Sequence, residues 1–253
     1  MTVRAETMAA IRFGYGFHPD QPAPDSSEAL RAQLRAGQSA GQMFPVKGPD
    51  ARRDAILEMR AAKRSGDEAA TQALRKKARR GAIREGLERE LERVLSPHGL
   101  HQRMTAFWAD HFTVSRRSAS HMMLIPSFEP EAIRPHMMGH FSDMLAAVTR
   151  HPAMLIYLDQ TTSFGPNSPK GLKRGRGLNE NLAREVLELH TLGVSADYTQ
   201  TDVREFAELL TGYGTHLGAA EFRFFPDWAE PGAETVLGQR YGGDNPEAAD
   251  AVA

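Results

Sequence analysis

The stretch from Leu178 to Tyr213 most constrains the fold. Its sequence indicates both ends of a helix, and it also separates an apolar face of that helix from a polar face. Asn179 can cap this helix, since its side-chain oxygen can accept from a first-turn amide that has no helical partner. Glu180 falls in the first turn, where the helix dipole favours negative charge. Gly193 follows the last leucine as a natural left-handed C-cap. The sequence therefore predicts a helix from Glu180 to Leu192.

A second helix follows in the same stretch. Thr199 is placed to cap it, and Asp202 three residues later forms a weaker capping box. Gly212 ends it, and beyond Gly214 the chain becomes aromatic and irregular, with room for a short hairpin. Together with helical patterns earlier in the chain, these helices predict an all-α fold, an irregular multi-helix domain that spans residues 1–253 as a single helical domain.

The first helix has an apolar face and a polar face. The predicted apolar face contains Leu182, Ala183, Val186, Leu187 and Leu189. The predicted polar face contains Glu180, Asn181, Arg184, Glu185 and Glu188. Since Arg184 lies four residues from Glu180 and four from Glu188, it can bridge both carboxylates. We expect the leucine face to be buried and the helix to be central in the domain.

His190 lies on the apolar face, among the leucines. It is either a buried histidine hydrogen-bonded to a backbone carbonyl, or a ligand or proton carrier that faces a pocket. The glutamates also allow two interpretations: a solvated face with ion pairs worth about 0.3–0.5 kcal/mol each, or a buried stripe that binds a cation or a polar ligand. The His-Glu-x-x-His and Glu-x-x-His spacings of metal-binding helices are absent from this helix, so the sequence identifies no metal.

The helix predicted from Leu100 to Val114 carries a second candidate histidine. Trp108 and His111 are three residues apart and share a face. They are either a core tryptophan with a histidine packed beside it, or part of a site shared with the helix from Glu180 to Leu192. The candidate catalytic residues are therefore His111, Glu185, Glu188 and His190. The candidate ligand-binding residues are Trp108, Asn179, Glu180, Asn181 and Arg184.

Composition excludes several classes of site and partner. The chain has 253 residues, 41% hydrophobic and 25% charged, which is typical of a globular protein. A formal net charge of -1 gives no overall attraction to nucleic acid, so no nucleic-acid partner is expected. The lack of cysteine excludes disulfides, thiolate metal sites and cysteine nucleophiles. No run of residues is apolar enough to span a bilayer and no signal peptide is visible, which predicts a cytoplasmic protein as written.

Residues 51–95 are rich in charge and predict a helical arm, broken into two helices near Ser65 and Gly66. The arm contains a basic run made of Arg75, Lys76, Lys77, Arg79, Arg80 and Arg84. Nucleic-acid binding is one interpretation of such a run, but interleaved aromatic residues are missing and glutamates resume at Glu85. The pattern favours a solvated helix face.

Residues 161–177 contain four glycines and two prolines. They also contain the basic residues Lys170, Lys173, Arg174 and Arg176. This composition predicts one long flexible basic loop. The loop is either a mobile surface linker or a lid that brings positive charge to the mouth of a site beside Asn179.

Five motifs, in order along the chain, resemble those of a bacterial family catalogued as domain of unknown function 1800. They are Phe107–Val114, Glu131–His136, His151–Leu155, Asn179–Gly193 and Tyr198–Gly212. The resemblance covers nearly the whole chain. Members of that family are usually helical, often exported, and often encoded beside proteins of domain of unknown function 1501, which resemble sulfatases and phosphatases. The resemblance therefore implies a protein of that second family as partner, in the periplasm or outside the cell.

The chain departs from the family pattern in two places. Relatives usually read His-Asp-x-Gly-x-Lys after the aromatic stretch, where this chain has Ala229, Glu230, Gly232 and Glu234. A site that used this histidine would be lost here. Relatives also usually continue well past the length of this chain, so the resemblance implies that it corresponds to an N-terminal portion.

Two functions follow from these observations. The first is a non-catalytic helical partner or scaffold of a bacterial, usually exported, assembly. The second is a hydrolase-like enzyme that uses His111, Glu185, Glu188 and His190 around a cation or a polar substrate. The sequence favours the first, because neither a Gly-x-Ser-x-Gly motif nor a cysteine is present to supply a nucleophile.

Overall fold

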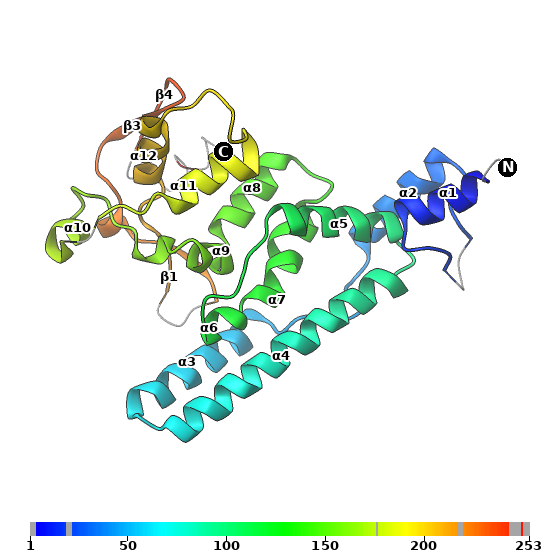
Figure 1. Cartoon of the computed structure of the whole chain (residues 1–253), viewed down its shortest axis with the longest axis horizontal. Helices are drawn as coiled ribbons and strands as arrows, with labels where there is room; N and C mark the ends of the chain where they lie inside the picture. Colours follow the sequence, from blue (N-terminus) through cyan, green and yellow to red (C-terminus); the bar gives the residue numbers. More distant parts are fainter. Residues whose placement is uncertain (1–3, 19–21, 176, 217–219, 243–248, 250–253) are drawn as a thin grey trace.

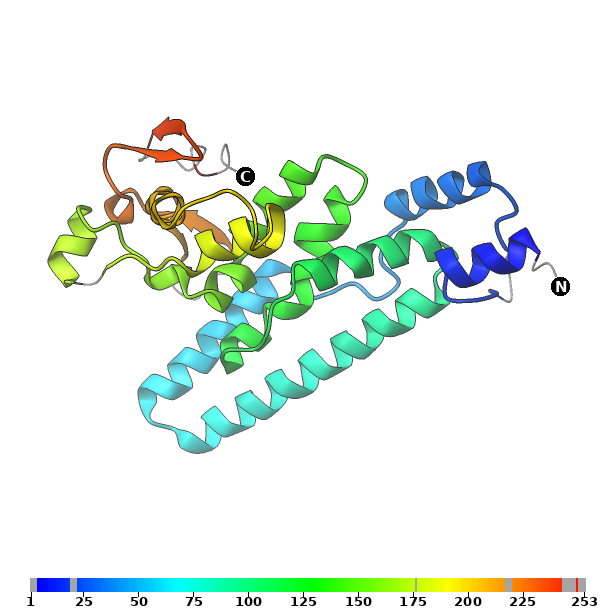
Figure 2. The ribbon, with the colours of Figure 1, turned by 45° about the horizontal axis from the view of Figure 1, so that its top comes forward.

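The structure, a computed structural model, describes residues 4–18, 22–175, 177–216, 220–242 and 249 of the chain. Figures 1 and 2 show two regions. We call the residues from Phe112 to Gly242, which form short helices and small sheets, the body; longer helices precede it in the chain and extend beside it. Within the described residues, no helix is both long and apolar enough to cross a membrane.

The predicted charged arm is a hairpin of two helices, α3 (Pro49–Ser65) and α4 (Glu68–Leu95). The break falls where the sequence indicates it, because Gly66 adopts a left-handed conformation with a φ of 74°, which glycine reaches without steric strain. Asp67 then caps α4, since its side chain accepts a hydrogen bond from Ala70 N at 2.8 Å. We call this hairpin the arm; it extends along one side of the body in both views (Figures 1 and 2).

Three helices form the other end of the extended region. Helices α1 (Ala5–Phe13) and α2 (Ser27–Ser39) pack against α5 (Gly99–His111), which turns back beside α4 (Figure 1). The two helices α2 and α5 approach closely at Gly37, where an added Cβ would lie 2.5 Å from the Cβ of His101. Helix α5 ends at the body, so it brings the candidate residues of its last turn there.

The body contains the remaining helices. In chain order they are α6 (Ala119–Met122), α7 (Ile125–Phe128), α8 (Phe141–Arg150), α9 (Pro152–Tyr157), α10 (Pro169–Arg174), α11 (Asn181–Glu185) and α12 (Gln200–Leu209). Shorter helical turns join them: η1 (Glu129–Ile133), η2 (Arg134–His136), η3 (Gln160–Thr162), η4 (Val186–Thr191) and η5 (Pro226–Trp228). The capping box predicted at Thr199 is confirmed at the start of α12, where Thr199 N donates to Asp202 Oδ2 at 2.8 Å and Asp202 N to Thr199 Oγ1 at 3.2 Å.

The last part of the body contains β-strands, so the fold is mostly helical and the all-α prediction is correct only in part. In the described residues, β1 (Tyr213–Thr215) pairs antiparallel with β2 (Phe222–Phe224), and β3 (Ala233–Val236) with β4 (Gln239–Gly242). Gly212, with a φ of 90°, turns the chain out of α12. The residues that follow are rich in aromatic and β-branched side chains, which fit a pleated and half-buried surface.

The hydrophobic core lies mostly in the body, and Ile56 of α3 joins it from the arm. Its fully buried side chains include Phe112, Ile133, Leu145, Leu155, Phe206, Leu210 and Tyr213. The predicted leucine face of the central helix joins this core through Leu182, Ala183, Val186 and Leu187. The prediction for Leu189 is wrong, because this side chain is 55% exposed. The helix is π-helical from Val186 onward, and the extra residue in each such turn moves the later side chains away from their α-helical positions.

Ion pairs join the inner side of the arm to the body. Glu129 accepts from Arg93 at 2.7 Å and pairs with Arg89 at 3.4 Å, both from α4. Two further pairs, both with a buried member, join Arg134 to Glu92 at 3.1 Å and Arg52 to Glu131 at 2.5 Å. The arm is therefore attached to the body through groups whose separation would leave charges buried without a partner.

The predicted flexible loop of residues 161–177 is wrong as a description of the backbone, because the segment includes part of η3 and all of α10. Phe164 is buried and packs edge-on against Trp228 at 5.0 Å, and Gly165 N donates to Trp228 O at 2.8 Å. A Cβ at Gly165 would lie 2.6 Å from the Cα of Glu230. The glycine thus permits close packing here, and composition alone does not distinguish that role from flexibility. Arg176 lies outside the described residues.

Candidate functional site

The helix that carries most of the candidate residues is α11 followed directly by η4. Asn179 Oδ1 accepts from Asn181 N at 2.9 Å, so Asn179 satisfies an amide at the helix start as predicted. Gly193, with a φ of 91°, ends the helix, and its amide donates to Leu187 O at 3.2 Å. Thr191 Oγ1 donates to Val186 O at 2.7 Å and so supports the wide turn from its side chain. π-Helical turns are frequent at functional sites.

His190 is buried in this turn. The simpler interpretation predicts a hydrogen bond from its side chain to a backbone carbonyl, and no such bond is found within the described residues. Its Nδ1 has no hydrogen-bond partner in the described part of the chain. The carbonyl of His190 instead accepts from His111 Nε2 at 3.1 Å. Burial, followed by repulsion from His111, lowers the pKa of His190 to about 4. A neutral imidazole with a free buried nitrogen costs about 1–3 kcal/mol, and such groups need an explanation in function or packing.

His111 and Trp108 surround His190 with aromatic rings. The Trp108 and His111 rings are 5.5 Å apart edge-on, and the His111 and His190 rings are 6.1 Å apart. Phe112 packs edge-on against His190 at 5.0 Å. His111 caps the end of η4 from a different helix, because the last carbonyls of a helix lack internal partners. This cluster joins α5 to the central helix and holds both histidines in fixed positions.

The polar face forms a ladder of ion pairs. Arg184 donates to Glu188 Oε1 at 2.9 Å and to Glu180 Oε2 at 3.1 Å, as its spacing predicts. It also donates to Gln200 Oε1 at 2.9 Å, which connects the ladder to α12. Arg184 thereby pairs with both carboxylates from one side chain. Asn181 is exposed beside them.

Glu185 stands apart from this ladder. Its side chain is half-buried and forms no hydrogen bond or ion pair with any described residue. Burial, and then repulsion from Glu188, raises the pKa of Glu185. Among the described residues, no hydrogen bond or ion pair joins Glu185 to His111. The structure thus brings His111, His190 and Trp108 together, and it holds Glu188 in a separate set of ion pairs.

A different set of carboxylates, which the sequence did not indicate, converges between α12 and β3. In the described part of the chain, Glu205, Glu208 and Glu234 are the one group of three or more potential metal ligands whose donor atoms all lie within 4.8 Å of one another. Burial and a hydrogen bond with Glu205, reinforced by repulsion from Glu208 and Glu230, raise the pKa of Glu234 to about 8. A proton therefore stays in this cluster at neutral pH. A hard divalent cation could take its place, since oxygen ligands suit such ions.

Comparison with known families decides where the chain belongs. The family model described as "Protein of unknown function (DUF1800)" matches residues 8–253. The chain is a member of the DUF1800 family. No curated protein and no solved structure matches it.

A further surface feature of this DUF1800 chain lies on the arm, in a different part of the chain from the candidate residues. The outer face of α4 exposes five apolar side chains at helical spacing: Ile83, Leu87, Leu91, Val94 and Leu95. We call them the α4 stripe. Each of them is between 47% and 62% exposed. The spacing is readable in the sequence, and only the exposure of this face had to come from the structure.

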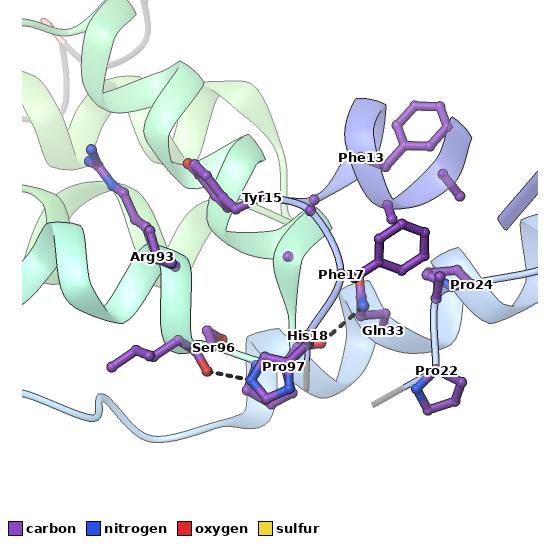
Figure 3. A pocket seen from close by; sticks show the side chains of 18 residues that line it. Phe13, Tyr15, Phe17, His18, Pro22, Pro24, Gln33, Arg93, Ser96 and Pro97 are labelled. Atoms are coloured by element: carbon purple, nitrogen blue, oxygen red, sulfur yellow. Dashed lines mark hydrogen bonds between the residues drawn. The ribbon is translucent and has the colours of Figure 1, made fainter. Parts of the chain in front are cut away.

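The α4 stripe runs into a hollow of about 340 Å³ between the end of α4 and the segment after α1. Figure 3 shows this hollow with Phe13, Tyr15 and Phe17 around it. Val94 and Leu95 belong both to the stripe and to the lining of the hollow. The three aromatic side chains are themselves partly exposed, with Phe17 at 66%. The stripe and the hollow therefore form one continuous apolar surface at this end of the arm.

Proposed function

We propose that this protein is a non-catalytic helical partner of another protein and that it binds that protein through the α4 stripe. The observation that carries the proposal is the exposure of the stripe on a helix whose opposite face is already paired with the body. Contiguous apolar surface of this kind marks protein interaction sites in soluble proteins.

The geometry of the stripe suits recognition by a helix or a groove. From Ile83 to Leu95 it extends about 18 Å at 1.5 Å per residue, and its anchors recur every three or four residues as in helix-in-groove complexes. The hollow of Figure 3 would accept a large side chain of the partner at one end. Arg84 and Glu90, whose side chains are 63% and 62% exposed, supply charges of both signs beside the stripe.

The partner we propose is a protein of domain of unknown function 1501, on the basis of the resemblance described above. Such a protein would be encoded beside this one and would meet it in an exported assembly. The proposal for the present chain is a supporting role: the arm presents the stripe, and the body holds the arm in position. The catalytic chemistry would then belong to the partner.

Site-specific photocrosslinking tests the proposal. A photoreactive amino acid replaces Leu91 in the stripe, and in a second protein it replaces Leu172, which is 71% exposed on α10. Each protein is produced together with its neighbour from domain of unknown function 1501 and then irradiated. We expect a crosslinked pair from position 91 and none from position 172. Crosslinking from neither position, or from position 172 alone, would contradict the proposal.

A hydrolase-like enzyme is the second candidate function, and the raised pKa of Glu234 is the observation that favours it. A carboxyl group that keeps its proton at neutral pH can act as a general acid, and the nearby carboxylates could hold a cation. Calorimetric titration with Ca²⁺, Mg²⁺ and Mn²⁺ tests this reading. Binding that Glu205→Gln abolishes and Glu185→Gln leaves intact would support an enzyme centred on this cluster, and no binding at millimolar ion would count against it.

A further inference from the structure

We propose that a second hollow, between the arm and α6, binds a phosphate-bearing anion. This hollow has a volume of about 690 Å³, within the range of about 300–1,000 Å³ that small-molecule sites occupy. It lies where α6 packs against α4, near the tip of the arm rather than at the α4 stripe (Figure 1). The inference is independent of the function proposed above, because it concerns a different surface and a different class of ligand.

Basic side chains from three parts of the chain converge on this hollow. They are Lys63 from α3, Arg75, Lys76 and Arg79 from α4, and Arg116 from the segment before α6. Within the described part of the chain, none of the five forms an ion pair and no acidic residue lines the hollow. Three arginines later in the same helix, Arg84, Arg89 and Arg93, are paired with glutamates. Positive charge without internal compensation is therefore concentrated at one concave place.

Hydroxyl groups line the hollow as well. Thr71 is 2% exposed and its side chain has no hydrogen-bond partner among the described residues. Ser120 also lines the hollow, and its hydroxyl contacts only Ser118 Oγ, at 3.3 Å, within the described part of the chain. Both hydroxyls are therefore available to a ligand in the hollow, since each can donate one hydrogen bond and accept others. Phosphate oxygens can accept hydrogen bonds from such groups and from arginine together.

The physical case for an anion rests on the number and arrangement of these groups. A single exposed ion pair contributes only about 0–1 kcal/mol, so one lysine or arginine would not make a site. Several like charges in a concave surface reinforce one another's field and raise the local concentration of an anion. Arginine in addition binds phosphate through two parallel hydrogen bonds. The floor includes the buried Met59, which limits solvent access from below.

Phosphate groups of this kind occur on soluble phosphorylated molecules and on the head groups of anionic lipids. The chemistry that the hollow recognises is the same in both cases. The two sources differ in what surrounds the phosphate: a soluble ligand would enter the hollow alone, whereas a lipid would bring a membrane surface against the tip of the arm. Two experiments are therefore needed, one for each source of phosphate.

Calorimetric titration with inorganic pyrophosphate tests for a soluble ligand. The variant Arg75→Gln/Arg79→Gln removes two charges that line the hollow. The control Arg60→Gln/Arg80→Gln removes two exposed charges of the same helices that do not line it. We expect the wild type and the control to bind alike, and the Arg75→Gln/Arg79→Gln protein to bind at least about tenfold more weakly. Thermal unfolding of all three proteins checks that they are folded.

Cosedimentation with vesicles tests for a lipid head group. Vesicles of phosphatidylglycerol and of phosphatidylcholine are compared with the same three proteins. Binding to phosphatidylglycerol alone, lost in Arg75→Gln/Arg79→Gln and kept in the control, would support a lipid head group even if pyrophosphate does not bind. Absence of binding both to pyrophosphate and to phosphatidylglycerol vesicles would overturn the inference. Equal losses in the two variants would also overturn it, because the effect would then follow net charge and not the hollow.

Discussion

The body and the outer face of α4 use apolar residues in opposite ways. In the body, Leu187 is 3% exposed and joins a continuous core. In the arm, Leu87 is 62% exposed although it lies on a helix with an equally regular pattern. The inner side of the arm is joined to the body by ion pairs and by Ile56, which is part of the core. The outer apolar face of α4 has no cover among the described residues. Apolar periodicity therefore predicts which face of a helix is apolar, but it does not predict whether another part of the protein covers that face.

This comparison predicts its largest effect at Glu129, where the two regions meet. Glu129→Ala leaves Arg89 without an ion-pair partner among the described residues and leaves Arg93 paired only with Glu90. We expect a loss of about 3–5 kcal/mol in the free energy of unfolding, measured in urea. Glu90→Ala is the matched control, because Glu90 also pairs with Arg93, at 2.6 Å, but is 62% exposed. The control should lose no more than about 1 kcal/mol. Equal losses would show that the arm is not held by the buried pair.

The next effect compares two leucines directly. Leu187→Ala opens a cavity in the core of the body and should cost about 2–5 kcal/mol. Leu87→Ala removes an exposed side chain and should change the free energy of unfolding by no more than about 0.5 kcal/mol. Urea denaturation of both variants gives the two values. A large loss at Leu87 would mean that the α4 stripe supports the fold of this chain.

The features predicted correctly from the sequence are those determined by neighbouring residues. The break at Gly66, the capping box at Thr199 and the bridge through Arg184 all depend on groups within a few positions. The features that were missed depend on tertiary contacts. Leu189 leaves the core because the helix widens into a π-turn, and Glu234 reaches Glu205 only through the packing of β3 on α12.

The candidate site likewise contains some features that neighbouring residues determine and others that depend on tertiary contacts. Sequence spacing placed Trp108 and His111 on one face, and the structure finds their rings in contact. Spacing did not reveal that His111 binds the carbonyl of His190, since the two residues are 79 positions apart. Nor did it show that Glu185 stays outside the ladder of ion pairs formed by Arg184.

The segment of residues 161–177 gives a prediction of intermediate size within the body. Gly165→Ala forces a Cβ to within 2.6 Å of the Glu230 backbone and should cost about 1–3 kcal/mol, as overpacking does. Gly177→Ala is the control, because an added Cβ there meets nothing within 4 Å. Trypsin should cleave at Lys170 or Lys173 faster in the first variant than in the second. Identical cleavage rates and identical stabilities in the two variants would support the flexible loop that the composition predicts.

A further prediction concerns the pH dependence of stability. His190 has a pKa of about 4 in the folded protein, below its usual value of 6.5. Between these two values the unfolded chain binds a proton that the folded chain does not, so stability falls as the pH falls through this window. His190→Gln should make that fall shallower, by at most about 1.4 kcal/mol per pH unit. His101, whose pKa is also lowered to about 4, keeps part of the dependence. An unchanged slope between pH 6.5 and pH 4 would show that His190 is not shielded from solvent.

The most direct test of the central claim measures binding and stability on the same proteins. Calorimetry gives the affinity for a protein of domain of unknown function 1501, the partner proposed above, and urea denaturation gives the free energy of unfolding. For Leu87→Ala/Leu91→Ala we expect affinity at least about tenfold weaker, with stability within about 1 kcal/mol of the wild type. The control Leu172→Ala should change neither. Absence of binding by the wild type, or affinity unchanged in the double variant, would contradict the claim that the α4 stripe is a docking surface.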